Sequence, residues 1–293
     1  MRNIILGLFL PLLLTTPALA DMNIVATLPW IGSLAREIGG DQVTVTTLVK
    51  PNQDPHYLEA KPSMILAARK ADMIMYNGLD LEIGYLPIIL ESARNPKIVP
   101  GKPGNFDCSR FVHVIEKPTA VDRSMGDIHP LGNPHYNFSP ANVLRVAQGM
   151  ADALADLDRT HADFYRQNFK GFAAKMEAHR KQWESVNLKG KEFVAYHRYF
   201  EYLAAEFGFR IVDYIEPKPG IPPSASHIEK LIEDMKSDKP TGILVTPGYG
   251  LKESESLSAR TGAKVVILPQ DVGAMPGTED WFSFMDTVLA ALR

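Results

Sequence analysis

The sequence predicts an α/β protein of two lobes, each a mainly parallel sheet flanked by helices, joined by one long connecting helix. Three observations lead to this prediction. Short β-branched runs alternate with amphipathic stretches in both halves of the chain, a pattern typical of parallel sheets covered by helices. A long helical pattern without proline separates the two alternating regions. The length of 293 residues is sufficient for two domains with their own cores.

The first twenty residues have the features of a secretory signal peptide rather than of the fold. Arg2 precedes an apolar run over residues 4–14, and Ala18-Leu19-Ala20 has the small-x-small pattern of a cleavage site. We therefore predict export to the periplasm and cleavage after Ala20. The apolar run is too short for a membrane-spanning helix, which needs about 20 apolar residues.

The N-terminal lobe is predicted to cover residues 21–139. Its expected strands are Asn23–Leu28, Gln42–Val49 and Met73–Tyr76, with Ile98–Val99 as a candidate fourth, and its expected helices are Ile31–Ile38 and Pro62–Lys70. The segment 102–129 lacks periodic apolar residues, so we expect a long irregular segment with a short strand at Phe111–Ile115.

Residues 140–185 are predicted to form the connecting helix. Apolar residues recur there at a spacing of three and four, and no proline interrupts them after Pro140. Ser139 is suited to the N-cap and Pro140 to the first helical position. A single helix of this length would extend about 65 Å and would act as a rigid connector between the lobes.

The C-terminal lobe is predicted to cover residues 186–293, where the alternation resumes. Its expected strands are Glu192–Tyr196, Arg210–Ile215, Gly242–Val245 and Lys264–Leu268, and its expected helices are Tyr199–Phe207, Ser226–Lys236, Glu253–Thr261 and Trp281–Leu292. The second of these helices begins with Ser226-x-x-Glu229, the pattern of a capping box.

Composition excludes several classes of protein. The net charge of −3 offers no basic face, so nucleic acid is not an expected partner. Cys108 is the single cysteine, which excludes an internal disulfide and cysteine-based metal sites. No large apolar surface stripe is evident, so we expect a monomer.

Four polar residues stand at or beyond the ends of predicted elements, where α/β proteins bind ligands. They are His56, His135, His197 and Asp271. Three imidazoles and one carboxylate at a common cleft would form a site for a first-row metal, with Zn²⁺ favoured by three nitrogen ligands. The pattern alone leaves open that these histidines are incidental and that the protein is a receptor for another ligand.

Three motifs resemble the solute-binding proteins of zinc/manganese ABC importers. They are Asp54-Pro55-His56-Tyr57-Leu58-Glu59, Gly132-Asn133-Pro134-His135 and Tyr196-His197-Arg198-Tyr199-Phe200-Glu201-Tyr202. The resemblance covers essentially the whole mature chain, including the two lobes, the helix between them and the Asp271 loop.

The resemblance implies that His56, His135, His197 and Asp271 bind the metal between the lobes. A histidine as the third ligand is the pattern of zinc-type members, whereas a glutamate would indicate the manganese type. The implied function is capture of Zn(II) and its delivery to an inner-membrane ABC permease. Whether a periplasmic metallochaperone supplies the ion stays open.

Two alternatives to a zinc receptor are a manganese-selective receptor of the same type, with Mn(II) as cargo, and a zinc-dependent hydrolase. We do not expect an enzyme, because the chain has no His-Glu-x-x-His pair and four protein ligands would leave no open position on the metal.

The sequence departs from the resembled family in two places. Asn137-Phe138-Ser139 stands where the family commonly has Leu-Asp before the proline, and the family's long histidine-rich loop is reduced here to His113 and His129. We interpret His129 as a loop residue that caps a turn, with a transient or substitute metal ligand as the alternative.

Further residues near the motifs have more than one interpretation. Glu59 and Glu201 are candidates for carboxylates that orient the ligands. The aromatic residues around His197 form either a dry wall beside the metal or ordinary core. They are Tyr196, Tyr199, Phe200 and Tyr202.

Overall fold

The structure is a computed structural model that describes residues 22–119 and 129–293. The predicted signal peptide and its cleavage site lie outside the described residues. The N-terminal half contains β1 (Met22–Ala26), α1 (Pro29–Gly39), η1 (Gly40–Gln42), β2 (Val43–Thr47), η2 (Pro55–Tyr57), α2 (Pro62–Lys70), β3 (Met73–Tyr76), α3 (Leu86–Ala93), β4 (Asn105–Asp107), η3 (Cys108–Phe111) and η5 (Tyr136–Phe138). The rest contains α4 (Pro140–Leu157), α5 (Ala162–Glu184), β5 (Glu192–Ala195), α6 (Glu201–Phe207), β6 (Arg210–Tyr214), α7 (Ala225–Asp238), β7 (Gly242–Val245), α8 (Leu251–Thr261), β8 (Val265–Ile267) and α9 (Trp281–Ala291).

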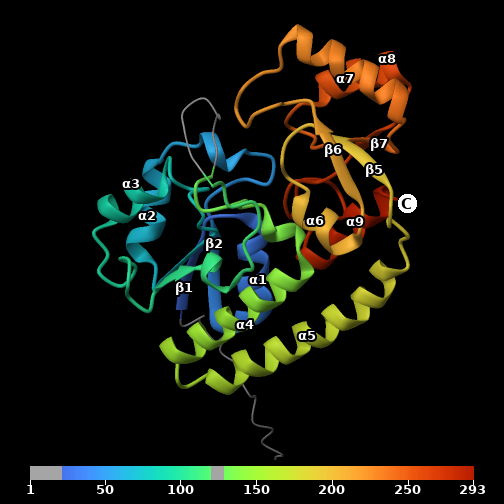
Figure 1. Ribbon diagram of the computed structural model, residues 1–293. Coiled ribbons are helices and arrows are strands. Elements are labelled where there is room, and N and C mark those ends of the chain that lie inside the picture. Colours follow the sequence, from blue (N-terminus) through green and yellow to red (C-terminus); the bar gives the residue numbers. More distant parts are fainter. Residues whose placement is uncertain (1–21, 120–128) are drawn as a thin grey trace, which may run out of the picture.

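Two four-stranded parallel sheets, one in each half of the chain, confirm the predicted α/β class (Figure 1). Their strand orders are β2-β1-β3-β4 and β6-β5-β7-β8. In the first sheet Ile24 lies opposite both Val45 and Met73. In each sheet, the connection after one middle strand runs to one edge, and the connection after the other middle strand runs to the opposite edge. α/β proteins bind ligands beyond the carboxyl ends of the strands where the connections diverge in this way.

The fourth strand of the first sheet is β4, so the expectation of a strand at Ile98–Val99 is wrong. The chain turns there, with Lys102 N–H donating to Val99 at 3.1 Å. Gly104 then brings the backbone close to its neighbours, since a Cβ at this position would lie 2.4 Å from the Asp72 carbonyl oxygen. Such a close approach of two backbone segments requires glycine, and apolar periodicity gives no sign of this requirement.

The expected strand at Phe111–Ile115 is also absent from the described structure. A 3-10 helix, η3, ends at Phe111, and the extended chain beyond it bonds to a helix instead of a strand. His113 N–H donates to the Asn142 side chain of α4 at 2.8 Å.

The connector consists of two helices, α4 and α5, rather than the predicted single helix. Asp158 ends α4, and its carboxylate accepts hydrogen bonds from the backbone N–H groups of Thr160 at 3.2 Å and His161 at 3.3 Å. The same carboxylate accepts a 2.8 Å bond from the Tyr165 hydroxyl of α5. The chain therefore reverses, and α5 returns beneath both lobes (Figure 1).

Helix α7 begins earlier than predicted. Ser224 is its N-cap and accepts from His227 N–H at 3.2 Å, so the expected capping box of Ser226 and Glu229 does not form. Glu229 instead pairs with Arg260 of α8.

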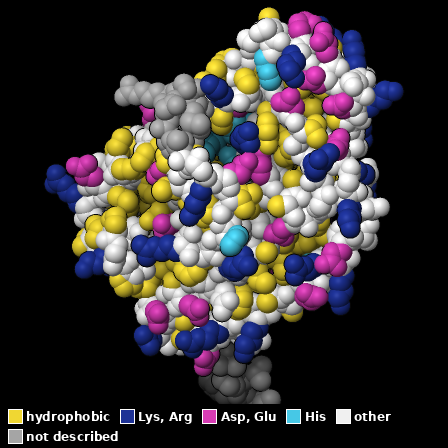
Figure 2. All heavy atoms as spheres, viewed as in Figure 1, with side chains coloured by type: hydrophobic (Ala, Val, Ile, Leu, Met, Phe, Trp, Pro, Cys, Tyr) yellow, Lys and Arg dark blue, Asp and Glu magenta, His cyan; other side chains and the backbone are white. Residues whose placement is uncertain are grey.

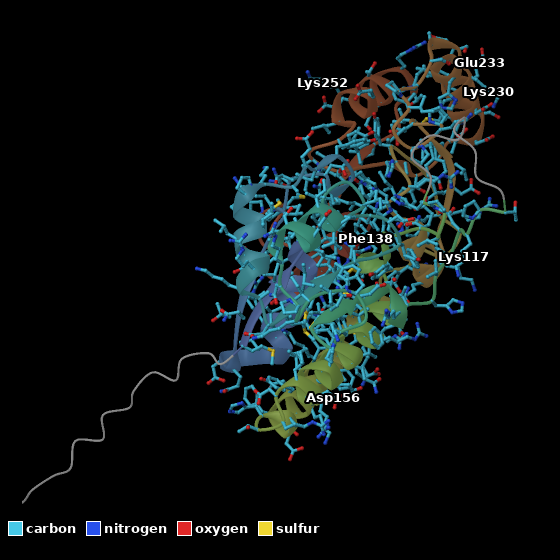
Figure 3. The ribbon with its side chains drawn as sticks, turned by 90° about the vertical axis from the view of Figure 1, so that its left-hand side faces the viewer. Lys117, Phe138, Asp156, Lys230, Glu233 and Lys252 are labelled. Atoms are coloured by element: carbon cyan, nitrogen blue, oxygen red, sulfur yellow. The ribbon has the colours of Figure 1, made fainter. Side chains whose placement is uncertain are left out.

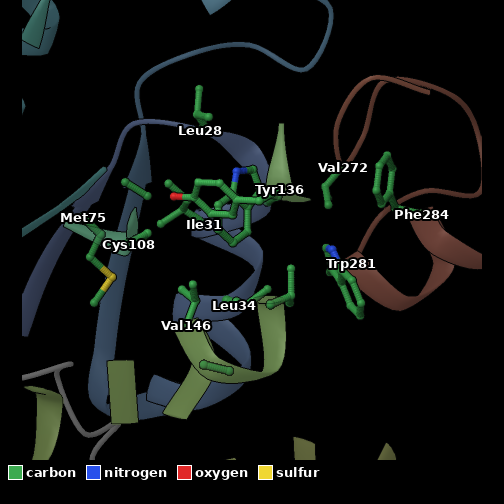
Figure 4. Close-up of a cluster of buried hydrophobic side chains, with 14 of the residues drawn as sticks. Leu28, Ile31, Leu34, Met75, Cys108, Tyr136, Val146, Val272, Trp281 and Phe284 are labelled. Carbon is green, nitrogen blue, oxygen red and sulfur yellow. The ribbon is translucent and has the colours of Figure 1, made fainter. Parts of the chain in front are cut away.

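One hydrophobic core continues from the first lobe to the last helix (Figure 4). Ile31 and Leu34 of α1 belong to it together with Trp281 and Phe284 of α9. Figure 3 shows Phe138 between the lobes, whereas Lys230 and Lys252 lie on the outer helices of the second lobe. Within residues 22–119 and 129–293, no helix combines the length and apolar character required to cross a membrane.

Candidate metal site

Three histidines from three separate segments meet between the lobes. His56 lies in η2 beyond β2, His135 immediately precedes η5, and His197 follows β5. One nitrogen from each ring lies within 4.8 Å of the others, and the ring centroids are 5.4 to 5.7 Å apart. His135 and His197 are buried, and 9% of the His56 side chain is exposed. Nitrogens at this spacing can share one metal ion.

A short local motif orients two of the rings. Asp54 accepts hydrogen bonds from both the backbone N–H of His56, at 3.0 Å, and its ring Nδ1, at 2.6 Å. Asn133 does the same for His135, at 2.9 Å in each case. Both motifs read Asx-Pro-His, and the proline fixes the backbone between the acceptor and the ring.

The third ring is oriented by a distant residue. The Nδ1 atom of His197 bonds to a carboxylate oxygen of Glu216, which lies just beyond β6. Because Nδ1 is occupied in all three rings, Nε2 is the atom left to bind a metal, and an oxygen acceptor on the other nitrogen is the usual companion of a ligating histidine. His135 Nε2 is buried without a hydrogen-bond partner, as expected of a ligand atom.

Burial and the neighbouring rings keep the His135 ring neutral, and Asp54 is ionised. Burial, followed by the nearby His56 and His197, holds the pKa of His135 well below its usual value. Burial alone would raise the pKa of Asp54, but its bonds to His56 and the charge of that ring lower it. A neutral imidazole beside an ionised carboxylate has its lone pair free for a cation.

Two cavities adjoin the histidines. The outer one has a volume of about 300 Å³ and is lined by His129, His135 and His197, with Arg198 and Lys218 at its wall. It corresponds to the hollow between the lobes in Figure 2, where histidine side chains lie at the bottom. The inner one, of about 30 Å³, is also lined by His135, together with Trp30 and Tyr199.

Asp271 lines the inner cavity together with His135 but is not part of the three-residue group among the described residues. Its carboxyl group accepts hydrogen bonds from the backbone of Val272 and Trp30. Burial raises its pKa to about 8, so the carboxyl group retains its proton at neutral pH unless a cation approaches. Its role as fourth ligand therefore stays a prediction.

His129 lies beside the three histidines without being one of the group whose nitrogens all lie within 4.8 Å of one another, so the interpretation as a turn residue is incomplete. Its carbonyl does accept from Gly132 N–H at 3.0 Å. Its ring nitrogen Nε2, however, is 3.0 Å from His56 Nε2. Burial, with the charges of His56 and His197, lowers the pKa of His129 to about 3.

The two carboxylates proposed as orienting groups differ in their surroundings. Glu59 is exposed. Glu201 accepts from the Tyr214 hydroxyl at 2.7 Å and from Asn133 Nδ2 at 3.3 Å, so it acts on His135 indirectly through Asn133. Burial raises the pKa of Glu201 to about 7.

The aromatic residues near His197 divide between wall and core. The ring of Tyr199 lies 4.4 Å from that of His135 and 4.6 Å from that of His197, so it walls the site. Phe200 packs against Phe138 in the core. The Tyr202 hydroxyl donates to the Asn133 carbonyl at 2.8 Å and so fixes the loop before His135.

The chain is similar over most of its length to known proteins. A family model described as the periplasmic component A of the zinc-uptake complex matches residues 24–293. The iron-binding protein YfeA of Yersinia pestis is 28% identical over 269 residues, which cover 86% of this chain and 81% of that protein. The zinc-binding lipoprotein AdcA of Streptococcus pneumoniae is 24% identical over 278 residues, covering 93% of this chain and 55% of that protein. A crystal structure of ZnuA has a TM-score of 0.76 at 27% identity, covering 92% of this chain and 96% of that one.

Proposed function

Because the chain belongs to the family of periplasmic zinc-uptake component A proteins, we propose that it captures zinc between its lobes and delivers the ion to an inner-membrane ABC permease. Proteins of this family are the metal-binding periplasmic components of ABC importers, which work with permease and ATPase components and are not enzymes. The observation that carries the proposal is the convergence of one ring nitrogen each from His56, His135 and His197.

The chemistry of the donors supports zinc over manganese. Relatives are named for iron as well as for zinc, so family membership leaves the metal open. Imidazole nitrogens suit Zn²⁺ and Fe²⁺, whereas Mn²⁺ prefers carboxylate and water oxygens. In our proposal three nitrogens form the floor of the site, and the Asp271 carboxylate completes a tetrahedral shell from the inner cavity.

The charges near the site suit a divalent cation. Asp54 and Glu216 each place a carboxylate behind a ligand ring and offset the charge of the ion without contacting it. Tyr199 packs against two of the rings and keeps the surroundings dry, which strengthens these interactions.

Calorimetric zinc titration of the demetallated protein tests the proposal. We expect a single tight site that is lost in His197→Ala, because that change removes both a ligand and the partner of Glu216. His113→Ala is the matched control, since His113 is exposed and outside the cluster. Wild-type zinc affinity in His197→Ala would refute the assignment.

Selectivity is tested by competition. We expect zinc to displace Mn²⁺ from the wild-type protein, and manganese not to displace zinc when present in equal amount. The reverse order would support a manganese receptor on the same fold.

A further inference from the structure

The outer cavity is larger than a single metal ion requires. Its volume of about 300 Å³ lies at the lower end of the range for small-molecule sites, which is about 300–1,000 Å³. A zinc ion bound through nitrogens at about 2.0–2.1 Å fits between its ligands and needs no further space. Because His135 and His197 line this cavity, a molecule inside it can reach an ion held by these rings.

The walls of the outer cavity are stiff and contain few polar groups. Among the described residues, four prolines line it, namely Pro118, Pro134, Pro217 and Pro219. The loop after β6 is also fixed by hydrogen bonds, since Gly220 N–H donates to the Glu216 carboxylate and Ile221 N–H to the Lys218 carbonyl, both at 3.0 Å. A preformed cavity with few polar groups is typical of a site for a small molecule.

The charged groups of the outer cavity suit an anion better than a bare cation. Among its described lining residues, Arg198 and Lys218 are cations and Glu116 is the single acid. Such cations repel a divalent ion, whereas they attract a ligand that carries negative charge. A zinc ion that arrives with its own carboxylates satisfies both the histidines and the cations.

The Arg198 side chain has donors available for a carboxylate. Its Nη1 atom donates to Glu116 at 3.0 Å and to the Tyr214 hydroxyl at 3.4 Å, and its guanidinium carbon lies 4.2 Å from the centre of the Tyr214 ring. Within the described part of the chain, the hydrogen bonds of this guanidinium involve Nη1 alone. The N–H groups of Nε and Nη2 remain, and they form an edge that binds a carboxylate through two parallel hydrogen bonds.

We propose that the outer cavity admits zinc as a complex with a small polycarboxylate, such as a hydroxytricarboxylic acid, whose free carboxylates bind Arg198 and Lys218. This inference rests on the proposed function and names the form in which the ion is captured. One oxygen of the chelator completes the shell formed by the three imidazoles. Asp271 lines the inner cavity and not the outer one, so it takes that position when the ion arrives without a chelator.

Equilibrium dialysis with radiolabelled citrate tests the proposal. We expect wild-type protein loaded with zinc in the presence of citrate to retain an equimolar amount of citrate, and much less when zinc is left out. Ethylenediamine, a zinc chelator without negative charge, should not be retained with the metal, because the cations of the cavity do not attract it. Loss of all citrate from the zinc-loaded protein, or equal retention of the two chelators, would overturn the proposal.

Arg198→Gln/Lys218→Gln tests the two cations. We expect this double variant to hold citrate at least about 10-fold more weakly than the wild type, because it removes two charge-assisted hydrogen-bond donors. Zinc titration without citrate shows whether the three histidines are still in place. Lys252→Gln/Arg260→Gln is the matched control, since it removes the same two kinds of charge from exposed positions of α8.

The results separate this inference from the proposed function. Equal citrate retention in the two double variants would contradict binding of a polycarboxylate by Arg198 and Lys218, and zinc capture by the histidines would stand. Failure of the wild-type protein to bind zinc, with or without citrate, would refute the function itself.

Discussion

Each proposed ligand ring is held by one oxygen atom, and these oxygens differ in charge. His56 and His197 bond to the carboxylates of Asp54 and Glu216, while His135 bonds to the amide of Asn133. A carboxylate makes the opposite ring nitrogen a stronger donor, and an amide fixes orientation without adding charge. The three rings should therefore contribute unequally to metal affinity.

Glu216→Gln should weaken zinc binding by about 10–100-fold, because glutamine keeps a hydrogen-bond acceptor for His197 but removes the charge behind it. Competition titration against a chelator measures the effect. Glu229→Gln is the control, since Glu229 pairs with Arg260 on the exposed face of the second lobe. Equal affinity in the two variants would mean that Glu216 has no part in tuning His197.

Asp271→Asn should reduce the proton release that accompanies zinc binding. In the metal-free protein, burial raises the Asp271 pKa to about 8, so below that pH the carboxyl group must lose a proton before it can bind the ion. Wild-type zinc affinity should accordingly increase as the pH rises toward about 8, and more steeply than that of the variant.

Calorimetry in buffers of different ionisation enthalpy counts the protons released. Equal release in wild type and Asp271→Asn would show that Asp271 stays outside the metal shell.

The sequence indicates the proposed ligands better than the groups that orient their rings. Asx-Pro-His occurs at both His56 and His135, so Asp54 and Asn133 could have been found from a local pattern. Glu216 carries no such signal, because pairing of β6 with β5 is what brings it to His197. The position of His129 likewise follows from tertiary contacts.

At the scale of elements, the turn between α4 and α5 shows where the spacing of apolar residues fails to predict the end of a helix. Apolar spacing continues across residues 158–161, so it predicts one helix. The Asp158 side chain accepts hydrogen bonds from the backbone N–H groups of Thr160 and His161 at the point where the helix ends. Because this interaction involves a polar side chain, it leaves the apolar pattern unchanged.

Asp158→Ala should lower the free energy of unfolding by about 1–2 kcal/mol, because it removes an acceptor for the backbone N–H groups of Thr160 and His161 and for the Tyr165 hydroxyl. Zinc affinity should not change, because the turn is remote from the histidines. Denaturant unfolding measures the loss, with Asp156→Ala as the control, since Asp156 is exposed and pairs with exposed Arg159. Equal stability of both variants would mean that the Asp158 hydrogen bonds do not stabilise the turn.

At the scale of the whole molecule, Trp281 joins both lobes and the connector. Its backbone N–H donates to Ser33 of α1 at 3.2 Å, and its ring N–H donates to the Asn137 carbonyl at 2.9 Å. Its ring packs against Phe172 and Trp183 of α5. Two lobes that share a core in this way should unfold together.

Differential scanning calorimetry of the wild-type protein should therefore show a single transition. Trp281→Ala should lower the free energy of unfolding by about 3–5 kcal/mol, as expected for a buried tryptophan. Ile88→Ala, at an exposed position of α3, should cost far less. Two resolved transitions in the wild-type protein would contradict a shared core.

The three nitrogens of the proposed site come from segments that are distant in the chain and belong to both lobes. A polypeptide translated or translocated only through its N-terminal lobe thus has at most two of them in place. If the chain is exported as its first twenty residues predict, we expect it to cross the membrane without cargo and to load an ion only after the segment that carries His197 has folded against the first lobe. In the proposed function, metal loading would then require both lobes to be folded, and a misfolded copy would carry no zinc to the permease.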